Sequence, residues 1–195
     1  QPAPPLVPLW QSPFADVGPD NWFYASVGYV YSRGLFQGVS ADAFSPNASM
    51  TRAMVVTVIH RLAGLPQGSG TSFDDVPSDS WYLAAVRWAH GEGIVTGSES
   101  RFNPEDSVTR EQLVTMLYRY VKAAGVPPAS SVDGIEEDLA GFVDSAEVSP
   151  WAREAMAWAA SIGLIEGRPG GRLDPTGTAT RAEVAAIMQR LASPT

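Results

Sequence analysis

The sequence predicts an all-α fold in which three helix-loop-helix repeats pack as a pseudo-threefold bundle. The same ordered set of residues occurs three times along the 195-residue chain, which is typical of repeat architectures. Apolar residues recur at helical spacing within each copy. A single pair of helices is too small to bury a core alone, so three similar units are expected to pack their apolar stripes together. Hydrophobic residues make up 45% of the chain and charged residues 17%, enough for such a core.

Each repeat opens with a Phe-x-Asp triplet and continues with a tryptophan, two glycines, an apolar-x-Pro triplet and a Thr-Arg pair. These residues are Phe14, Asp16, Trp22, Gly34, Gly38, Phe44, Pro46, Thr51 and Arg52 in the first copy; Phe73, Asp75, Trp81, Gly93, Gly97, Phe102, Pro104, Thr109 and Arg110 in the second; and Phe142, Asp144, Trp151, Gly163, Gly167, Leu173, Pro175, Thr180 and Arg181 in the third. They predict repeats over 14–64, 73–125 and 142–192, an N-terminal extension over 1–13, and a linker or insertion over 126–141. The insertion is expected to be either a short helix or a surface loop.

The first helix of each repeat is predicted from the residues around the tryptophan. We expect it to begin at an N-cap two residues before the tryptophan, at Asp20, Asp79 and Ser149, with Pro150 at the first helical position of the third copy. The glycine twelve residues after the tryptophan fits the left-handed position just past a helix end; these glycines are Gly34, Gly93 and Gly163.

The second helix of each repeat is predicted to begin at the threonine of the Thr-Arg pair. Thr109 with Gln112, and Thr180 with Glu183, match a capping box, whereas Thr51 is followed by Met54 and has only half of one. Apolar residues at i, i+3, i+4 and i+7 follow in all three copies, so each helix should bury one face.

Composition excludes several classes of function. The chain has no cysteine and only 2 histidines, so we expect no disulfide, no metal site and no cofactor. Its net charge of -8 opposes binding to nucleic acid or anionic lipid, and it lacks an apolar run long enough to span a membrane. The Pro-rich start has no signal-peptide pattern, so either a signal has been removed or the chain is a module of a longer protein.

Catalysis is also not expected. The sequence contains no Gly-x-Ser-x-Gly, His-Glu-x-x-His, phosphate-loop or calcium-loop motif, so no catalytic residue is assigned. His60 and His90 lie at unrelated places in their repeats, and His60 is expected to cap or line a helix face. Polar features that repeat three times favour binding, in which several weak sites add avidity.

The three arginines Arg52, Arg110 and Arg181 are the strongest candidate binding residues. Each lies at the first position of a predicted helix, where a cation costs about 0.3–1 kcal/mol. An anion held by the free backbone N–H groups and the guanidinium would offset this cost, and a carboxylate fits the arginine fork. The alternative is an ion pair with Asp16, Asp75 and Asp144, which could also hold an arginine that in turn holds a ligand.

Tryptophans and glycines complete the candidate set. Trp22, Trp81 and Trp151 are expected either to stack on a sugar ring or to pack in the core, and neither is favoured. Core packing is favoured for Trp88 and Trp158. Gly38, Gly97 and Gly167 either let the backbone approach a ligand or occupy a turn that needs positive φ, and for each residue we favour the turn.

The ordered motifs resemble the S-layer homology domain family in three tandem copies, from Phe14 to about Ala192. The resemblance rests on Phe-x-Asp-Val, Trp-Tyr/Phe, Gly-Ile/Leu-x-x-Gly, Phe-x-Pro and Thr-Arg-Ala-Glu, the last intact from Thr180 to Glu183. The first copy has Met54 in place of the glutamate, and the second reads Glu111 and Gln112 after its arginine. Gly171 of the third copy matches a loop glycine of the family, where the other copies have Asp42 and Ser100, so we expect the grooves to differ.

The resemblance implies an extracellular module at the bacterial cell wall. Such triplets anchor surface proteins non-covalently by binding a secondary cell-wall polysaccharide, commonly one bearing pyruvylated N-acetylmannosamine. The family fold is a three-pronged, monomeric pseudo-trimer with ligand grooves between the prongs. The family's arginine maps onto Arg52, Arg110 and Arg181, with the candidate aspartates, tryptophans and glycines shaping the grooves. Further domains are expected outside this chain. The alternatives are a protein–protein module for surface-array assembly and a wall-active hydrolase.

Overall fold

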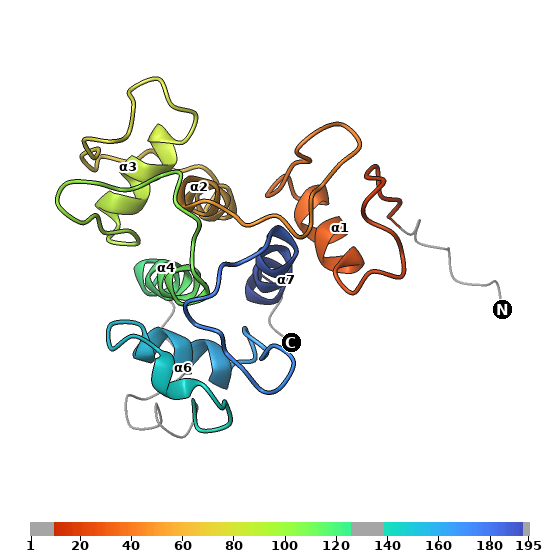
Figure 1. Cartoon of the computed structure of the whole chain (residues 1–195). Coiled ribbons are helices and arrows are strands. Elements are labelled where there is room, and N and C mark those ends of the chain that lie inside the picture. Colours follow the sequence, from red (N-terminus) through yellow and green to blue (C-terminus); the bar gives the residue numbers. More distant parts are fainter. Residues whose placement is uncertain (1–9, 126–138, 193–195) are drawn as a thin grey trace. The chain divides into compact units, whose positions relative to one another are not determined.

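The computed structural model describes residues 10–125 and 139–192 (Figure 1). Most of the expected N-terminal extension and of the insertion therefore lies outside the described residues. The chain divides into two compact units. The first unit comprises residues 1–48 and 181–195, and the second unit comprises residues 49–180.

The described residues form α-helices joined by loops and contain no strand, which confirms the all-α prediction. The second helices are α2 (Arg52–Leu62), α4 (Arg110–Ala123) and α7 (Arg181–Ala192), and each begins directly after its threonine. The Thr51 side chain accepts a hydrogen bond from the Met54 N–H at 3.3 Å. Thr109 and Gln112 form both halves of a capping box. The predictions for these two helix starts are confirmed.

The N-caps of the first helices lie three residues later than predicted, at Phe23, Tyr82 and Ala152. They are α1 (Tyr24–Ser32), α3 (Leu83–Gly91) and α6 (Arg153–Ser161), and their N-cap residues make no side-chain cap hydrogen bond. The predicted caps at Asp20, Asp79 and Ser149, and the helical position of Pro150, are therefore wrong. The reason is a turn closed by i to i+3 backbone bonds: Tyr24 N to Asn21 O, Leu83 N to Ser80 O, and Ala152 N to Ser149 O. The candidate tryptophans lie in this turn, not in the helix.

The ends of the first helices follow the prediction. Gly34, Gly93 and Gly163 have φ values of 68°, 69° and 66° and lie just past the helix ends. This left-handed conformation is readily available to glycine. A short 3-10 helix, η2 (Ser145–Glu147), precedes α6.

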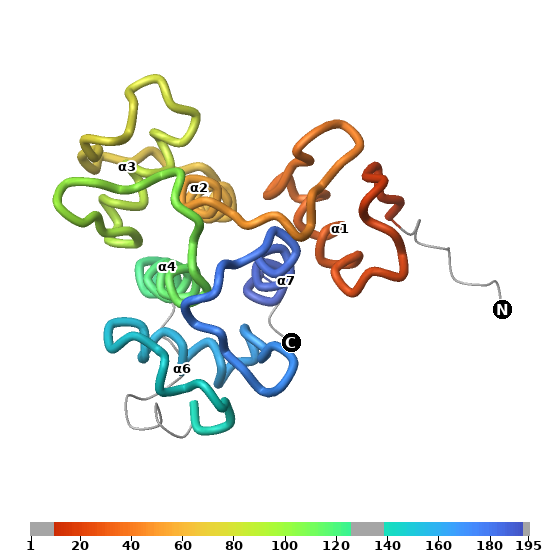
Figure 2. Tube along the Cα trace, viewed as in Figure 1, coloured from red at the N-terminus to blue at the C-terminus, as the bar shows by residue number. Residues whose placement is uncertain are grey.

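The helices pack in pairs that join different repeats. In the first unit α1 packs on α7, and in the second unit α3 packs on α2 and α6 packs on α4 (Figures 1 and 2). Helices α2 and α4 also touch. Each first helix therefore covers the apolar stripe of a second helix from another copy. The pseudo-threefold packing of all three pairs stays a prediction.

A closed ring of backbone hydrogen bonds links the three copies inside the second unit. The N–H of Met50 donates to the carbonyl of Ala179 at 3.0 Å, that of Ala179 to Val108 at 3.1 Å, and that of Val108 to Met50 at 2.9 Å. These residues come one position before Thr51, Thr109 and Thr180. The same backbone hydrogen bond therefore occurs three times, each time between equivalent residues of two repeats.

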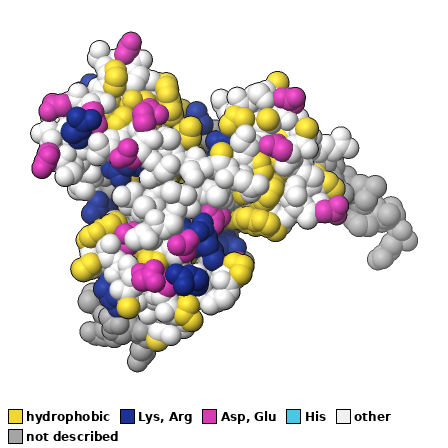
Figure 3. Space-filling view, viewed as in Figure 1, with side chains coloured by type: hydrophobic (Ala, Val, Ile, Leu, Met, Phe, Trp, Pro, Cys, Tyr) yellow, Lys and Arg dark blue, Asp and Glu magenta, His cyan; other side chains and the backbone are white. Residues whose placement is uncertain are grey.

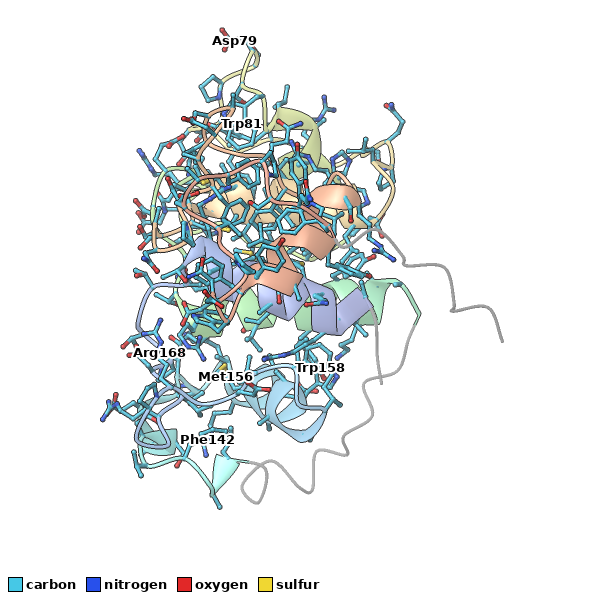
Figure 4. All side chains as sticks on the ribbon, turned by 90° about the vertical axis from the view of Figure 1, so that its right-hand side faces the viewer. Asp79, Trp81, Phe142, Met156, Trp158 and Arg168 are labelled. Atoms are coloured by element: carbon cyan, nitrogen blue, oxygen red, sulfur yellow. The ribbon has the colours of Figure 1, made fainter. Side chains whose placement is uncertain are left out.

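The two tryptophans for which core packing was favoured, Trp88 and Trp158, belong to the core. Trp88 is 6% exposed and Trp158 is 3% exposed, as predicted, and Figure 4 shows Trp158 and Met156 on α6. His60 is buried, packs 5.2 Å from the Trp88 ring and bonds the Pro66 carbonyl through Nε2 at 2.9 Å. It therefore lines a helix face, as expected. In the part of the chain that the structure describes, no helix is long and apolar enough to cross a bilayer.

Replacing Thr109 by Ala should lower the free energy of unfolding by about 0.5–2 kcal/mol, because the Gln112 N–H loses the threonine hydroxyl that accepts its hydrogen bond, while the bond from the Thr109 N–H to the Gln112 side chain can remain. Urea denaturation followed by circular dichroism measures the change. Thr176→Ala, at an exposed loop position, is the matched control and should have little effect. Equal stability of the Thr109 variant and the wild type would contradict this assignment of the cap.

Candidate functional site

All three candidate arginines hold a loop carbonyl. The Nε of Arg52 donates to the Phe102 carbonyl at 2.8 Å, that of Arg110 to Leu173 at 2.8 Å, and that of Arg181 to Phe44 at 2.7 Å. Each acceptor is the apolar residue of an apolar-x-Pro triplet in a different repeat. The bond that positions each arginine is therefore made to the backbone, not to the aspartates considered as alternatives.

The first backbone N–H groups of the second helices are also occupied. In each helix the first two N–H groups donate to two backbone carbonyls of a loop in another repeat. The donors and acceptors are Arg52 and Ala53 to Asp106 and Pro104, Arg110 and Glu111 to Gly177 and Pro175, and Arg181 and Ala182 to Ala48 and Pro46. The expectation that free backbone donors face an anion at these helix ends is therefore wrong. Loop carbonyls take the place of the anion, so anion binding here must rest on side chains.

The candidate aspartates hold the same loops from the other side. Asp16 accepts hydrogen bonds from the N–H groups of Phe44 and Ser45, Asp75 from Phe102 and Asn103, and Asp144 from Leu173 and Asp174, all at 2.7–2.8 Å. The middle residues of the triplets, Ser45, Asn103 and Asp174, have φ values of 57°, 55° and 50°. A non-glycine residue adopts this left-handed conformation at a cost, so the two bonds to each carboxylate stabilise a strained loop.

The pKa values of two of these aspartates reflect this role. Burial by itself raises the pKa of Asp75 and of Asp144. The backbone N–H groups of each loop, helped by Arg101 and Arg172 respectively, outweigh burial and leave both pKa values below the ordinary value. The ionised form is therefore the one that the fold stabilises.

We call this arrangement the loop clamp: an aspartate bonds the N–H groups of an apolar-x-Pro loop, and an arginine from another repeat bonds its carbonyl. Arg52 also lies 4.8 Å from the Phe102 ring centre, and Arg181 lies 4.6 Å from that of Phe44. The clamp gives the arginines and aspartates a structural role. Their contact with a ligand stays a prediction.

Gly38, Gly97 and Gly167 make room for the protein's own phenylalanines. A Cβ at Gly97 would lie 2.4 Å from Cε1 of Phe73, and one at Gly38 would lie 2.5 Å from Cε1 of Phe14. At Gly167 the distance to Cε1 of Phe142 would be 3.0 Å. None of the three has a positive φ, so the turn explanation is wrong. Their approach to a ligand stays a prediction.

The three candidate tryptophans are exposed. The exposed fraction is 67% for Trp22, 63% for Trp81 and 53% for Trp151, which excludes the core-packing alternative. Trp22 and Trp81 make perpendicular ring contacts with the next residue in the chain, Phe23 and Tyr82. Large exposed aromatic rings of this kind are available for stacking.

One groove of about 490 Å³ in the second unit brings candidate residues together. We call it the Arg52 groove. It is lined by Arg52 at the start of α2, Gly97 and Arg101 in the loop after α3, Gln112 and Arg119 on α4, and Trp151 before α6, among others. Residues of all three repeats thus meet in one hollow of the size typical for small-molecule sites.

The Arg52 groove is electropositive although the chain is acidic. Three guanidinium groups, from Arg52, Arg101 and Arg119, and a single carboxylate, from Asp106, are among its lining residues. Burial lowers the pKa of Arg52, and the nearby Asp106 and Asp75 carboxylates offset only part of this effect. Arg52 still carries its positive charge at neutral pH, because arginine is not deprotonated in proteins. Acidic and basic side chains are interspersed over the face shown in Figure 3. The groove therefore concentrates positive charge that the net charge of -8 does not reveal.

Arg52 differs from Arg110 and Arg181 in the hydrogen-bond partners of its terminal nitrogens. Among the described residues, no hydrogen-bond partner contacts either terminal nitrogen of Arg52. The Nη2 of Arg181 donates to the Gln37 carbonyl at 2.7 Å, and that of Arg110 approaches the Glu166 carbonyl at 3.5 Å. Arg110 and Arg181 are also buried, at 5% and 7% exposed, whereas Arg52 is half-buried. Arg52 thus presents both terminal nitrogens to this groove with no competing hydrogen-bond partner among the described residues.

Sequence reasoning missed Arg101 and Arg119. A signal for Arg119 exists, because Arg61, Arg119 and Arg190 each follow the Thr-Arg arginine by nine residues. Arg101 has a counterpart in Arg172 but not in the first repeat. The terminal nitrogen of Arg119 lies 3.5 Å from the Thr96 hydroxyl, and Arg101 lies 3.7 Å from the Asp75 carboxylate.

Glu111, a departure from the Thr-Arg-Ala-Glu motif, positions Trp151. Its carboxylate is 4% exposed and accepts hydrogen bonds from the Ser149 N–H at 3.0 Å and from the Ser149 hydroxyl at 2.8 Å. Ser149 begins the turn that contains Trp151. The other copies have Ala53 and Ala182 at this position, so this bond to the tryptophan-bearing turn is specific to the second repeat.

Comparison with known proteins gives one family. The model of the S-layer homology domain matches residues 13–53, 72–114 and 141–185. An amylopullulanase of Thermoanaerobacterium thermosulfurigenes is 32% identical over 173 residues, which cover 88% of this chain and 9% of that protein. The surface-layer 125 kDa protein of Lysinibacillus sphaericus is 28% identical over 169 residues, covering 85% of this chain and 14% of that protein.

A solved structure, an undecaheme cytochrome from the S-layer of Carboxydothermus ferrireducens, aligns with a TM-score of 0.46 and 20% identity. The alignment covers 85% of this chain and 20% of the cytochrome chain. The chain thus spans only a small part of the length of the relatives that it matches.

Acid should weaken the loop clamp. Because the pKa values of Asp75 and Asp144 are lowered in the folded protein, their contribution is complete above the unfolded pKa of about 3.9 and is lost as the pH falls through the folded value. The double variant Asp75→Asn/Asp144→Asn should lose about 1.5–3 kcal/mol per site at pH 7. It should also show a flatter fall in stability below pH 4.

Urea denaturation from about pH 7 to about pH 2.5 measures both effects. Asp79→Asn, which makes the same kind of substitution at one exposed carboxylate (Figure 4), is the control. An unchanged acid dependence in the double variant would refute the role of the aspartates in the clamp.

Gly97→Ala should destabilise the protein by about 1–3 kcal/mol, because the new methyl group overlaps the Phe73 ring and the Arg101 carbonyl. Gly141→Ala adds the same methyl group where nothing lies within 4 Å and should be close to neutral. Thermal and urea denaturation of the two variants give the comparison. If both behave alike, close packing is not the reason for glycine at position 97.

Proposed function

The chain belongs to the S-layer homology domain family and is a protein of the bacterial cell surface; from this premise we propose that it anchors a larger surface protein non-covalently to the cell wall. The ligand in this proposal is a secondary cell-wall polysaccharide. Its relatives include both an enzyme and a surface-layer protein, and the shared segment is a small part of each. A module shared by proteins of such different activity fits a common task of attachment.

The Arg52 groove carries the proposal. It combines an arginine whose terminal nitrogens have no bonding partner in the described structure, two further arginines, and the exposed indole of Trp151. An arginine fork binds a carboxylate through two parallel hydrogen bonds, and an indole face covers the C–H face of a sugar ring. An acidic sugar satisfies both requirements, and pyruvylated N-acetylmannosamine carries a carboxylate on its ketal.

In this proposal some of the remaining candidates belong to the Arg52 groove and the others occupy equivalent positions elsewhere. Asp75 and Gly97 shape the groove by fixing the loop after α3, and Trp151 supplies the stacking surface. Arg110 and Arg181, with Asp16, Asp144, Gly38 and Gly167, hold equivalent loops, and Trp22 and Trp81 offer equivalent indoles. We assign the main binding site to the Arg52 groove because Arg110 and Arg181 are buried and bond carbonyls through Nη2.

The proposal does not include catalysis. The amylopullulanase relative matches this chain over 9% of its own length, so its activity is not transferred. The proposed chemistry is recognition alone: charge-assisted hydrogen bonds to a carboxylate and stacking on a ring. We keep repeats 14–64, 73–125 and 142–192 as the proposed domain organisation.

Arg52→Lys and Trp151→Ala should each weaken binding of the methyl glycoside of pyruvylated N-acetylmannosamine by about 10-fold or more. Lysine keeps the charge but lacks the planar fork, which can bond the Phe102 carbonyl through Nε and a carboxylate through two parallel bonds from the terminal nitrogens. Each charge-assisted bond contributes about 1.5–3 kcal/mol. Isothermal titration calorimetry measures the affinity, and circular dichroism checks the fold.

Trp81→Ala, which removes an equally exposed indole outside the Arg52 groove, is the matched control. The sugar without its pyruvyl group should bind weakly to the wild type. Wild-type affinity in both groove variants would refute the assignment of the site. Undiminished binding to walls stripped of polysaccharide would instead support a protein partner.

A further inference from the structure

A second hollow of about 450 Å³ lies next to the Arg52 groove in the second unit. We call it the Lys122 hollow. It is lined by Glu92 at the end of α3, by Tyr118, Lys122 and Ala123 on α4, and by Glu154 on α6, among others. The first repeat has Gly64 where the second has Lys122, so this hollow is not a simple product of the repeated pattern.

Three residues line both hollows. Thr115 and Arg119 of α4, together with Trp151, are shared between the Arg52 groove and the Lys122 hollow. Trp151 is 53% exposed, so its indole stands at the boundary with much of its surface free. The two hollows are therefore neighbours along one surface, and a chain molecule can occupy both by crossing Trp151.

The chemistry of the two hollows differs. The Lys122 hollow has two basic side chains, Arg119 and Lys122, and two acidic ones, Glu92 and Glu154, so its charges balance. The Tyr118 hydroxyl donates to Glu154, and Lys122 lies 5.1 Å from the Tyr118 ring centre. Burial and then the Glu154 carboxylate raise the pKa of Tyr118 to about 12, which keeps the phenol protonated at neutral pH. Balanced charges, donors, acceptors and the exposed indole of Trp151 suit a neutral polar ring rather than an anion.

We propose that the Lys122 hollow is a second saccharide subsite, for a neutral hexose or N-acetylhexosamine next to the acidic sugar in the same glycan chain. The inference rests on the proposed function, because it requires a glycan in the Arg52 groove. The acidic sugar binds beside Arg52, the chain passes over Trp151, and the neutral sugar contacts Lys122 and Glu92. The module then recognises a chain segment and not only a terminal sugar.

The test uses an indole that fills the Lys122 hollow. Ala123 is exposed and lines the hollow, whereas Ala124 is its exposed neighbour and is not among the lining residues, so Ala123→Trp and Ala124→Trp form a matched pair. The probes are the methyl glycoside of pyruvylated N-acetylmannosamine and size-fractionated wall-polysaccharide fragments of two to four sugars that end in this residue. Calorimetry on the full chain gives the affinities.

The proposal predicts that the wild type binds the longer fragments at least about 10-fold more tightly than the single sugar. Ala123→Trp should abolish this gain and leave the affinity for the single sugar unchanged, and Ala124→Trp should behave as the wild type. Lys122→Ala should lower the gain without affecting the single sugar.

Equal affinity of the wild type for short and long probes, or an undiminished gain in Ala123→Trp, would overturn the second subsite while leaving the proposed function intact. Failure of the wild type to bind any of these probes would overturn both.

Discussion

The loop clamp is the contact on which the rest of the structure depends. An aspartate of one repeat bonds the N–H groups of an apolar-x-Pro loop, and an arginine of another repeat bonds its carbonyl, as Asp75 and Arg52 do around Phe102. The loop in turn supplies the carbonyls that satisfy the start of a second helix. Loss of either charged partner leaves buried polar groups unpaired, which costs more than the bond itself contributes. Repeats are thereby tied to one another through charge and not only through apolar packing.

The clamp also explains how one site can arise from a threefold pattern. It fixes each guanidinium through Nε, so function depends on what the terminal nitrogens meet. The Nη2 atoms of Arg110 and Arg181 contact backbone carbonyls. The terminal nitrogens of Arg52 instead face the groove that Arg101, Arg119 and Trp151 also line. Glu111 binds the turn of Trp151 to α4. An arginine held in place before binding loses little conformational entropy on binding, which favours affinity.

Features that depend on local sequence were predictable. Thr51 and Thr109 cap their helices, and Gly34, Gly93 and Gly163 follow helix ends, because each feature needs only its chain neighbours. The caps at Asp20, Asp79 and Ser149 failed because a turn precedes each helix. The partners of Arg52 could not be foreseen, since a backbone carbonyl has no signature in the sequence. Glu111 looked like a departure from a motif, and its contact with Ser149 became visible only in three dimensions.

The most direct test of the account is a crystal structure of this chain with the methyl glycoside of pyruvylated N-acetylmannosamine. The account predicts that the ligand carboxylate lies within hydrogen-bond distance of both terminal nitrogens of Arg52, that Nε stays on the Phe102 carbonyl, and that Trp151 covers the sugar ring. A ligand bound away from Arg52, or an Arg52 side chain that leaves the loop to reach it, would contradict the account.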